Sequence, residues 1–493
     1  MSYTLHPHQI EAMALLRESL KSGRKRPMLQ AVTGFGKTIL AATIIEAARA
    51  RNRRVIFCVP AISLIDQTVE KFVRQGISCV GVMQGQHPAT DAAQPVQVAS
   101  VQTLQRRKLP VADLVLIDEA HLRFRFVSDW MRRPEWAEVP FIGLSATPWS
   151  RGLGQDYDDL IVGARLPDLI EQGFLSPFRV FAPCHPDLSK VRTVAGDFRE
   201  DDLALAMNQP TLVANAVSTW LAHGEDRPTL LFAVDRAHAR RLAEEFEAAG
   251  VPTGYVDAKT PREERQAIGR RLHHGQIKVV CNVGCLTTGI DWDVRCISLV
   301  RPTKSEMLFV QIIGRGLRTA VGKDDCIVLD HSDTTLRLGF PTDIHHDTLD
   351  NGRSVRARAK GRERATPLPR ECPSCSRLKP AGVHACPSCG FAPERQSAIL
   401  ERDGQLVAIS GSRKAEPTHD QKQTFYGMLL AYQRERGYNA GYVAHKFRER
   451  FGVWPRGLAD RLVPPDITFL GWIKSRQIAF AKGRQRGGQA NAA

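Results

Sequence analysis

The feature that most constrains the fold is an alternation of apolar strands and helical stretches, with one strand and helix joined by a glycine-rich turn. MLQAV (28–32) is a short apolar strand, TGFGKT (33–38) follows it, and ILAATIIEAARA (39–50) has the pattern of a helix. The alternation continues to residue 150. Because strands separated by helices pair in parallel, the sequence predicts an α/β fold with a parallel sheet flanked by helices.

The glycine-rich turn has the composition of a phosphate-binding loop. Its backbone N–H groups would point outward at the start of a helix, a geometry that binds phosphate. Lys37 is expected to reach the β- and γ-phosphates of a nucleotide, and the Thr38 hydroxyl to bind Mg²⁺. Ala31 replaces the first glycine of the usual motif. The residues predicted to contact the nucleotide here are Thr33, Gly34, Gly36, Lys37 and Thr38.

Two adjacent carboxylates end a later apolar strand, LVLIDEAH (114–121). Asp118 is expected to hold Mg²⁺ directly or through water. Glu119 is expected to orient and deprotonate the water that attacks the γ-phosphate. A charged strand end that faces solvent is the simpler alternative, but the phosphate loop upstream favours a catalytic pair.

Residues 228–330 repeat the alternation of strands and helices without a second phosphate loop. A second sheet domain without its own loop is expected to complete the site of the first. QIIGRGLR (311–318) supplies Arg315 and Arg318, which would share one face if the segment is helical. Arginines suit this role because negative charge builds on the phosphate oxygens in the transition state.

Two Cys-x-x-Cys pairs with ten residues between the inner cysteines predict a zinc ribbon at 371–392. Their ligands would be the thiolates of Cys372, Cys375, Cys386 and Cys389. The segment has few apolar residues, so the metal is expected to supply its folding energy. The other seven cysteines lie in or beside apolar runs and are expected to be small buried hydrophobes.

Positive charge is concentrated late in the chain. Of the net charge of +16, residues 1–350 contribute almost nothing, with 42 Lys and Arg against 41 Asp and Glu. Residues 351–370 carry seven basic residues against one acidic residue, and residues 396–493 carry sixteen against eight. The segregation favours a polyanion-binding appendage, although a solvated basic surface would give the same count.

The combination of DEAH, AVTGFGKT and LSATP (144–148) resembles a superfamily 2 helicase. The resemblance implies two tandem RecA-like domains with parallel sheets and an ATP-dependent activity. It also implies that Gln9, in LHPHQ (5–9), reads adenine. VPAISLIDQ (59–67) and VASVQTL (98–104), which includes Thr103, match segments that grip the nucleic-acid backbone.

The same resemblance assigns roles in the second half of the chain. TTGID (287–291) resembles a motif in which Thr287 and Thr288 would contact strand phosphates. Gly289 and Asp291 would face the nucleotide and the boundary between domains. In QIIGRGLR, the two arginines would act as fingers, and Gln311 would lie near them.

The paired cysteine motifs after the second domain are similar to those of the RadD (YejH) type of bacterial DNA-repair helicase and its phage-borne relatives. That resemblance implies a DNA-dependent ATPase in repair or recombination that docks on single-strand-binding protein. An RNA helicase shares every motif of the core and remains an alternative. So does an ATP-gated nucleic-acid clamp that does not separate strands.

The tail contains a stretch with helical spacing, QTFYGMLLAYQRERGYNAGYVAHKFRERFGVWPRG (423–457). We expect its aromatics to form mainly a core, with nucleic acid bound by a basic face of Arg434, Arg436, Lys446, Arg448 and Arg450. No eighteen-residue apolar run and no secretory signal occurs, so we expect a cytoplasmic protein without a membrane partner. The expected domains are 1–165 (ATP-binding), 166–225 (connecting), 226–340 (second RecA-like), 341–370 (basic linker), 371–392 (zinc ribbon) and 415–480 (basic helical module).

Overall fold

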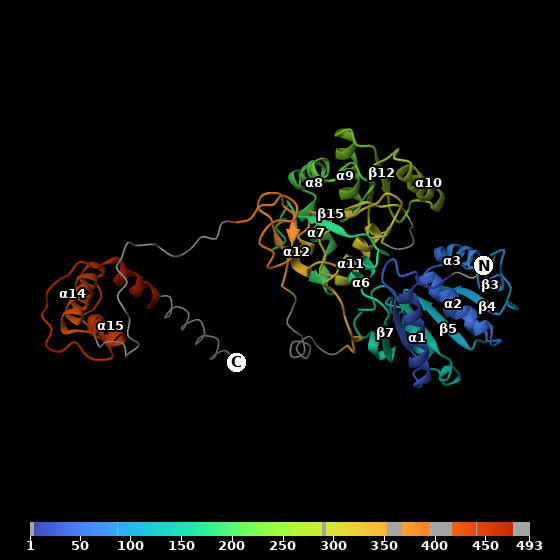
Figure 1. Ribbon diagram of the computed structural model, residues 1–493, viewed down its shortest axis with the longest axis horizontal. Helices are drawn as coiled ribbons and strands as arrows, with labels where there is room; N and C mark the ends of the chain where they lie inside the picture. The colour runs from blue at the N-terminus through green and yellow to red at the C-terminus, as the bar shows by residue number, and fades with distance from the viewer. Residues whose placement is uncertain are drawn as a thin grey trace. The chain divides into compact units, whose positions relative to one another are not determined.

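The computed structural model describes residues 4–85, 87–287, 292–352, 367–393, 417–439 and 441–476. The chain divides into two compact units, residues 1–395 and 396–493. The first unit contains two lobes, coloured blue to cyan and green to yellow in Figure 1. Three residues with predicted roles, Thr288, Gly289 and Asp291, lie outside the described residues.

The first lobe is built on a seven-stranded sheet in the order β3-β4-β2-β5-β6-β1-β7, and every neighbouring pair is parallel. Its strands are β1 (Pro27–Gln30), β2 (Val55–Val59), β3 (Val80–Val82), β4 (Val96–Ser100), β5 (Leu114–Asp118), β6 (Phe141–Ser145) and β7 (Asp159–Val162). The carboxyl ends of β1 and β5, where the phosphate loop and the paired carboxylates begin, therefore lie at the same edge of the sheet.

Both faces of this sheet are covered, which explains the unbroken apolar runs of its strands. Along β5, Leu114 and Leu116 face the core shared with α1, α2 and α3, whereas Val115 and Ile117 face the core shared with α4 and α5. The helices of this lobe are α1 (Pro7–Lys21), α2 (Lys37–Arg49), α3 (Ile65–Arg74), α4 (Val101–Arg106) and α5 (Arg125–Met131), with short 3₁₀ turns η1 (Ile62–Leu64), η2 (Pro134–Trp136) and η3 (Leu153–Gln155).

The second lobe has a six-stranded parallel sheet in the order β12-β13-β11-β14-β15-β8. Its strands are β8 (Phe178–Phe181), β11 (Thr229–Phe232), β12 (Thr253–Val256), β13 (Val279–Asn282), β14 (Cys296–Leu299) and β15 (Cys326–Asp330). The edge strand β8 comes from the segment 166–225 that was expected to connect the lobes. Two parallel α/β domains in tandem confirm the predicted fold class.

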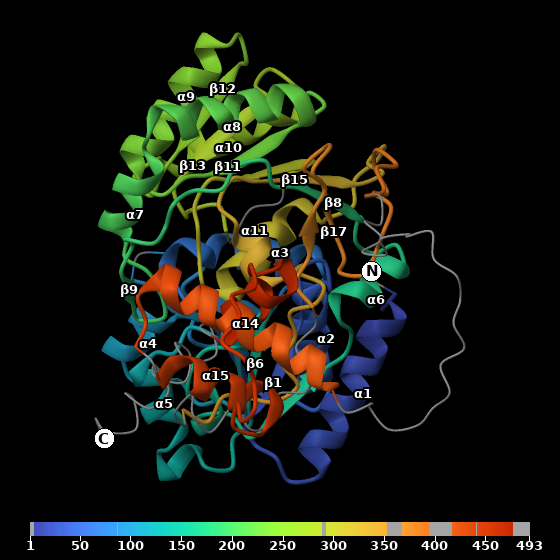
Figure 2. The same ribbon diagram turned by 90° about the vertical axis from the view of Figure 1, so that its left-hand side faces the viewer.

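Helices cover both faces of the second sheet as well. They are α7 (Glu200–Met207), α8 (Pro210–His223), α9 (Arg236–Ala248), α10 (Arg262–His273), α11 (Glu306–Gly316) and α12 (Thr334–Leu338), and a small hairpin, β9 (Thr193–Val194) with β10 (Asp197–Phe198), precedes α7. Helix α6 (Leu166–Glu171) instead borders α1 of the first lobe. Helix α11 lies on the side of the sheet that faces the first lobe in both views (Figures 1 and 2). Apolar residues of the two lobes form one continuous cluster, which includes Phe35 and Ile313.

The cysteines outside the paired motifs pack as expected. Cys58, Cys184, Cys281, Cys296 and Cys326 are buried, and Cys79 and Cys285 are partly buried. Burial raises the pKa of the Cys58 and Cys326 thiols to about 12, so they stay protonated and behave as small apolar groups.

The predicted zinc ribbon lies against the edge of the second sheet. Its hairpin consists of β16 (Arg370–Glu371) and β17 (Leu378–Lys379), which are antiparallel. Ala182 donates a backbone hydrogen bond to the Ser376 carbonyl at 3.0 Å, and Phe181 forms an antiparallel bridge with Arg377. The ribbon thereby covers backbone groups of β8 that would otherwise form an open sheet edge.

The second unit is a helical module with its own core. It contains α14 (His419–Arg436), α15 (Gly441–Phe451) and a helical segment at 467–476. Six of the eight aromatics predicted as core belong to its apolar cluster: Phe425, Tyr426, Tyr432, Tyr442, Phe447 and Phe451. Tyr438 and Trp454 are exposed instead. Among the described helices of the whole chain, none combines the length and the apolar character of a membrane-spanning segment.

Candidate nucleotide site at the boundary of the two lobes

The glycine-rich turn joins β1 to α2 and ends on two glycines with left-handed backbones. Gly34 has a φ of +80° and Gly36 a φ of +85°, and Lys37 begins the helix. A Cβ on Gly34 would lie 2.3 Å from Leu175 Cδ2, and one on Gly36 would lie 2.3 Å from Gln9 Nε2. Both positions therefore favour glycine. A side chain there would strain the left-handed backbone, and its Cβ would overlap a neighbouring side chain.

Lys37 and the paired carboxylates form one ion cluster between α2 and β5. The Lys37 ammonium lies 2.7 Å from Asp118 Oδ1 and 2.6 Å from Glu119 Oε1. Burial by itself would lower the pKa of Lys37, but attraction to both carboxylates raises it above the ordinary lysine value. The cluster brings together the two predicted motifs, which are 82 residues apart in sequence.

Glu119 has an unusual backbone conformation, and its surroundings favour the ionised carboxylate. Its φ of +48° falls in the left-handed region, which a non-glycine residue occupies only when its surroundings impose it. Burial opposes its charge, but attraction to Lys37, a hydrogen bond from the same ammonium and attraction to Arg315 lower the pKa of Glu119 overall. The carboxylate is thus ionised at neutral pH and able to accept a proton.

His121 and Gln311 connect this cluster to the second lobe. The Gln311 amide donates to Thr147 Oγ1 at 2.8 Å, and its nitrogen lies 3.3 Å from His121 Nε2. On the other side of the ring, His121 Nδ1 lies 2.8 Å from Ser145 Oγ. Since an amide nitrogen only donates, Nε2 of His121 accepts and Nδ1 carries the proton. Burial lowers the pKa of His121, which favours this neutral form.

A second contact between the lobes joins the phosphate loop to α11. A Cβ on Gly314 would lie only 2.4 Å from Thr33 Oγ1, so the helix backbone approaches the loop closely. One residue later, Arg315 lies near enough to Glu119 to lower its pKa. Farther from the nucleotide loop, Arg262 pairs with Asp66 across the lobes at 2.8 Å.

Arg318 differs from the expectation that it shares a helical face with Arg315. Helix α11 ends at Gly316, and Arg318 forms an antiparallel bridge with Leu175 instead. The Ser176 N–H donates to the Leu317 carbonyl at 2.7 Å and fixes the chain there. Pairing with the 175–176 segment therefore replaces a further helical turn.

The remaining predicted residues lie at the same edges of the two sheets. Gln9 is buried in α1, where Nε2 donates to the Phe35 carbonyl at 2.8 Å and Oε1 accepts from His6 N at 3.0 Å. Thr103 follows β4, and its Oγ1 lies 3.0 Å from Ser100 Oγ. Thr287 follows β13 and donates to the Gly284 carbonyl at 2.9 Å. Thr38 is the second residue of α2.

Three residues of the site have no role in the sequence-based prediction: His121, Thr147 and Gly314. Each lies inside a motif that the sequence displays, namely DEAH, LSATP or QIIGRGLR. What the sequence does not display is their partners. Thr147 and Gln311 are separated by 164 residues, so only the folded chain joins them.

The four cysteines of the paired motifs have the geometry of a zinc site. Their sulfurs all lie within 4.8 Å of one another. Cys372 and Cys389 are 3.7 Å apart between sulfurs, as are Cys375 and Cys386. A tetrahedron with Zn–S bonds of about 2.3 Å requires sulfurs roughly 3.8 Å apart, so this donor set fits Zn²⁺.

A phosphate loop and carboxylate pair in one parallel lobe, completed by a helix of a second parallel lobe, define a nucleic-acid-dependent ATPase of the tandem RecA-like class. Comparison with known proteins agrees. The family model described as "Type III restriction enzyme, res subunit" matches residues 2–150, and "Helicase conserved C-terminal domain" matches residues 212–320. The chain belongs to the superfamily 2 helicases, and ATP with Mg²⁺ is the cofactor that these domains imply.

Individual relatives support the assignment. A 51.5 kDa protein of a Lactococcus phage is 28% identical over 397 residues, covering 78% of this chain and 82% of the phage protein. The candidate ATP-dependent helicase IRC3 of Saccharomyces cerevisiae is 31% identical over 353 residues, covering 66% of this chain and 51% of the yeast protein.

Solved structures share the fold. A fragment of a candidate HsdR subunit of a type I restriction enzyme from Vibrio vulnificus superposes with a TM-score of 0.53 at 19% identity, covering 71% of this chain and 67% of that one. The ATP-dependent Type ISP restriction-modification enzyme LlaBIII, bound to DNA, superposes with a TM-score of 0.50 at 17% identity, covering 66% of this chain and 27% of that one. At these identities, the likeness supports the fold alone.

The contact between Gly314 and Thr33 makes the first prediction. Gly314→Ala should lower the ATP hydrolysis rate about tenfold to a hundredfold, because the added methyl group forces α11 away from the phosphate loop. The measurement is steady-state hydrolysis at saturating ATP. Gly471→Ala is the matched control, since a Cβ there meets no atom within 4 Å. An unchanged rate for Gly314→Ala would show that the lobes need not approach this closely.

The cysteine geometry makes the second prediction. The purified chain should contain one zinc ion, and Cys389→Ser should lose it and lower the melting temperature, because three thiolates hold the metal less tightly. Zinc is measured by atomic absorption and unfolding by calorimetry. Cys79→Ser, outside the cluster, should keep the ion. A chain purified without zinc, or full zinc content in Cys389→Ser, would contradict the site.

Proposed function

We propose that this protein is an ATP-driven motor that moves on or remodels DNA, in repair or recombination. The observation that carries the proposal is the convergence of groups from both lobes on one site. Lys37, Asp118 and Glu119 come from the first lobe, while Gln311 and Arg315 come from the second. Such a site couples the chemistry of the nucleotide to the relative position of the lobes.

In this proposal the first lobe binds the nucleotide and activates the water that attacks its γ-phosphate. When bound, ATP would supply the γ-phosphoryl group, and Mg²⁺ would neutralise part of the phosphate charge. Lys37 would exchange its carboxylate partners for the β- and γ-phosphates, and Thr38 and Asp118 would hold the metal. Glu119, already ionised, takes the proton of the attacking water. Gln9, fixed against the phosphate loop, reads the adenine base.

The second lobe completes the site. Arg315 and Arg318 stabilise the charge that develops on the phosphate, while Gln311 holds α11 against His121 and Thr147. Gly289 and Asp291, which lie outside the described residues, are assigned to the nucleotide by the sequence motif alone. Because Gln311 contacts His121, whose Nδ1 lies 3.4 Å from Glu119 Oε2, a change at Glu119 reaches α11 through His121. ATP therefore closes the lobes and hydrolysis opens them.

Nucleic acid binds across both lobes in this proposal. Thr103 and Thr287 follow parallel strands at the carboxyl edges of their sheets, and Thr288 is next to Thr287. Contacts on both lobes allow alternating grips on the strand backbone as the lobes open and close. Zinc stabilises the ribbon against the edge of the second lobe.

The reason to propose DNA rather than RNA is the likeness to restriction enzymes, because the family model that matches residues 2–150 is described as a type III restriction enzyme subunit. The basic module adds a surface suited to a single strand: Trp454 is 40% exposed, and the Arg448 guanidinium lies 4.7 Å from its ring centroid. An exposed aromatic next to cations stacks bases without requiring a sequence. Single-strand-binding protein remains a candidate partner.

The test of this function is ATP hydrolysis without nucleic acid and with single-stranded DNA, forked duplex DNA or RNA, at low and moderate salt. DNA should stimulate hydrolysis and RNA should not.

Glu119→Gln should bind ATP normally but hydrolyse it about 10²- to 10⁴-fold more slowly, because the general base is removed.

Each alternative corresponds to one result. Stimulation by RNA alone would make the protein an RNA helicase. Stimulation by DNA without displacement of a strand from the fork would make it a clamp or remodeller. Normal hydrolysis by Glu119→Gln would remove that residue from its assigned role.

The position of the basic charge makes a separate prediction. Deleting residues 396–493 should weaken DNA binding and flatten its dependence on salt, by about 0.7 in the logarithmic slope for each single-strand phosphate that the module neutralises.

Trp454→Ala should weaken single-strand binding by roughly tenfold without changing the slope, because stacking releases no counterions. Ile467→Ala, an exposed apolar residue of the same module, is the control. An unchanged salt slope after the deletion would identify the module as a protein-docking surface.

A further inference from the structure

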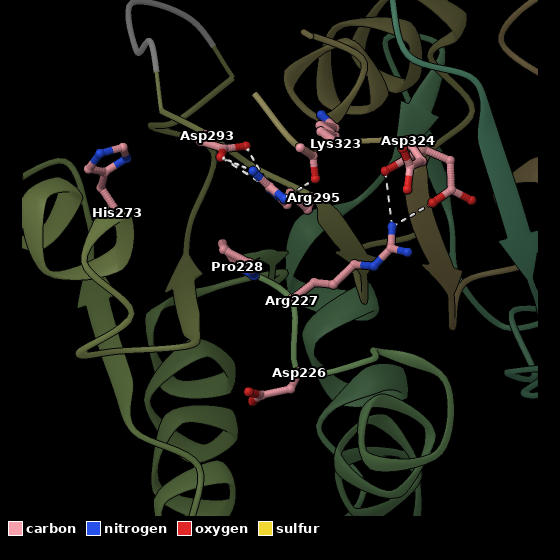
Figure 3. Close-up of a pocket in the computed structure, with 10 residues that line it drawn as sticks. Asp226, Arg227, Pro228, His273, Asp293, Arg295, Lys323 and Asp324 are labelled. Carbon is pink, nitrogen blue, oxygen red and sulfur yellow. Dashed lines mark hydrogen bonds and ion pairs between the residues drawn. The ribbon is translucent and has the colours of Figure 1, made fainter. Parts of the chain in front are cut away.

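The turn between α11 and β15 lies at the amino edge of the second sheet, opposite the carboxyl edge at which Thr287 follows β13. It borders a cavity of about 360 Å³ (Figure 3), whose lining includes Arg227, Asp293, Arg295, Lys323 and Asp325. The predicted chemistry uses none of these residues. The turn nevertheless follows directly on the segment that carries Arg315 and Arg318, so what holds the turn also holds the arginines.

Lys323 is bound at the end of α11. Its ammonium donates to three backbone carbonyl oxygens: Gly316 at 2.5 Å, Arg318 at 2.6 Å and Val294 at 2.8 Å. Figure 3 shows its side chain directed away from Asp226 and Pro228 on the opposite side of the cavity. An ammonium group has three donors, so each of them is used.

These bonds satisfy an electrostatic need of α11. The last carbonyl groups of a helix have no partner within the helix, and they carry the negative end of its dipole. Gly316 is the last residue of α11, so the Lys323 cation supplies both a hydrogen bond and a favourable charge at this end. Burial lowers the pKa of Lys323, in agreement with a cation held by carbonyl oxygens rather than by a carboxylate.

The neighbouring chain is fixed in the same way. Arg295 donates to the carbonyl oxygens of Val321 at 2.8 Å and Gly322 at 2.6 Å, while Asp293 holds the same guanidinium at 2.9 Å. On the opposite side, the backbone of Arg318 pairs with Leu175, whose side chain packs against Gly34 of the phosphate loop. The segment from Gly316 to Arg318 is thus held between Lys323 and a residue that touches the loop.

We propose that Lys323 is a positioning residue for catalysis: it fixes the end of α11 so that Arg315 and Arg318 meet the phosphate of a bound nucleotide. The inference rests on the function proposed above, because it assigns the arginines to the transition state. Preorganised charges are effective only when they are held where charge develops, and small displacements reduce their effect steeply.

The test compares kcat and KM for ATP in Lys323→Met, which keeps the length of the side chain but removes its three donors. We expect kcat to fall about tenfold with little change in KM, because the phosphate loop that binds ATP belongs to the other lobe. Lys278→Met is the matched control. Lys278 lies at the same edge of the same sheet and pairs with Asp226 at 2.6 Å, so its replacement should leave kcat unchanged.

A double-mutant cycle separates positioning from general stability. In a background that carries Arg315→Ala and Arg318→Ala, Lys323→Met should change kcat less than about twofold, since it has no arginine left to position. If Lys323→Met does not fold, as judged by its melting temperature, Lys323→Arg takes its place. Arginine keeps the charge but not the three-way geometry, so its kcat should fall between those of the wild type and the background without the two arginines.

The outcomes distinguish the two proposals. An equal fall in kcat in both backgrounds, or a rise in KM with kcat unchanged, would overturn the role of Lys323 and leave the proposed function standing. If removal of both arginines has no effect on kcat, the finger assignment itself fails, and the positioning role fails with it. A fall in kcat confined to the background with intact arginines supports both.

Discussion

The hydrogen bonds of Gln311 across the lobe boundary are the constraint on which the rest of the site depends. Its buried amide nitrogen contacts both His121 and Thr147, so the position of α11 on the first lobe is fixed. Arg315 lies one helical turn farther along α11, and this position brings it near Glu119. Buried polar pairs of this kind are costly when broken, which makes them suitable for coupling two bodies.

The charged side chains of the site partly neutralise one another. Lys37 neutralises part of the charge of Asp118 and Glu119, and it keeps Glu119 ionised despite burial. The left-handed backbone of Glu119 places its side chain beside Lys37 and His121 at some conformational expense. A nucleotide phosphate would compete with the carboxylates for the same ammonium, which would link nucleotide binding to the freedom of Glu119, the proposed general base.

The accessory parts have distinct physical roles. The cysteine ribbon is joined to the second lobe by backbone pairing with β8, so the proposed zinc ion would stabilise a segment that closes a sheet edge. Such a role would explain why a large protein with adequate cores has a small cysteine-rich element. The helical module has a separate aromatic core, and it leaves Trp454 and its neighbouring arginine on the surface.

The sequence by itself determined the two parallel α/β lobes, the phosphate loop, the carboxylate pair and the cysteine set. Each of these depends on residues close together in the chain, so the strand-turn-helix pattern around Lys37 and the spacing of Cys372 and Cys375 are visible without coordinates. Most aromatics of the tail also packed as their helical spacing indicates. Only the tertiary structure decided that α11 ends at Gly316, that Gly314 faces Thr33 and that Lys323 binds the carbonyl groups of Gly316 and Arg318. These contacts join elements through space, and nothing in the local pattern of a chain specifies which distant backbone groups a side chain will meet.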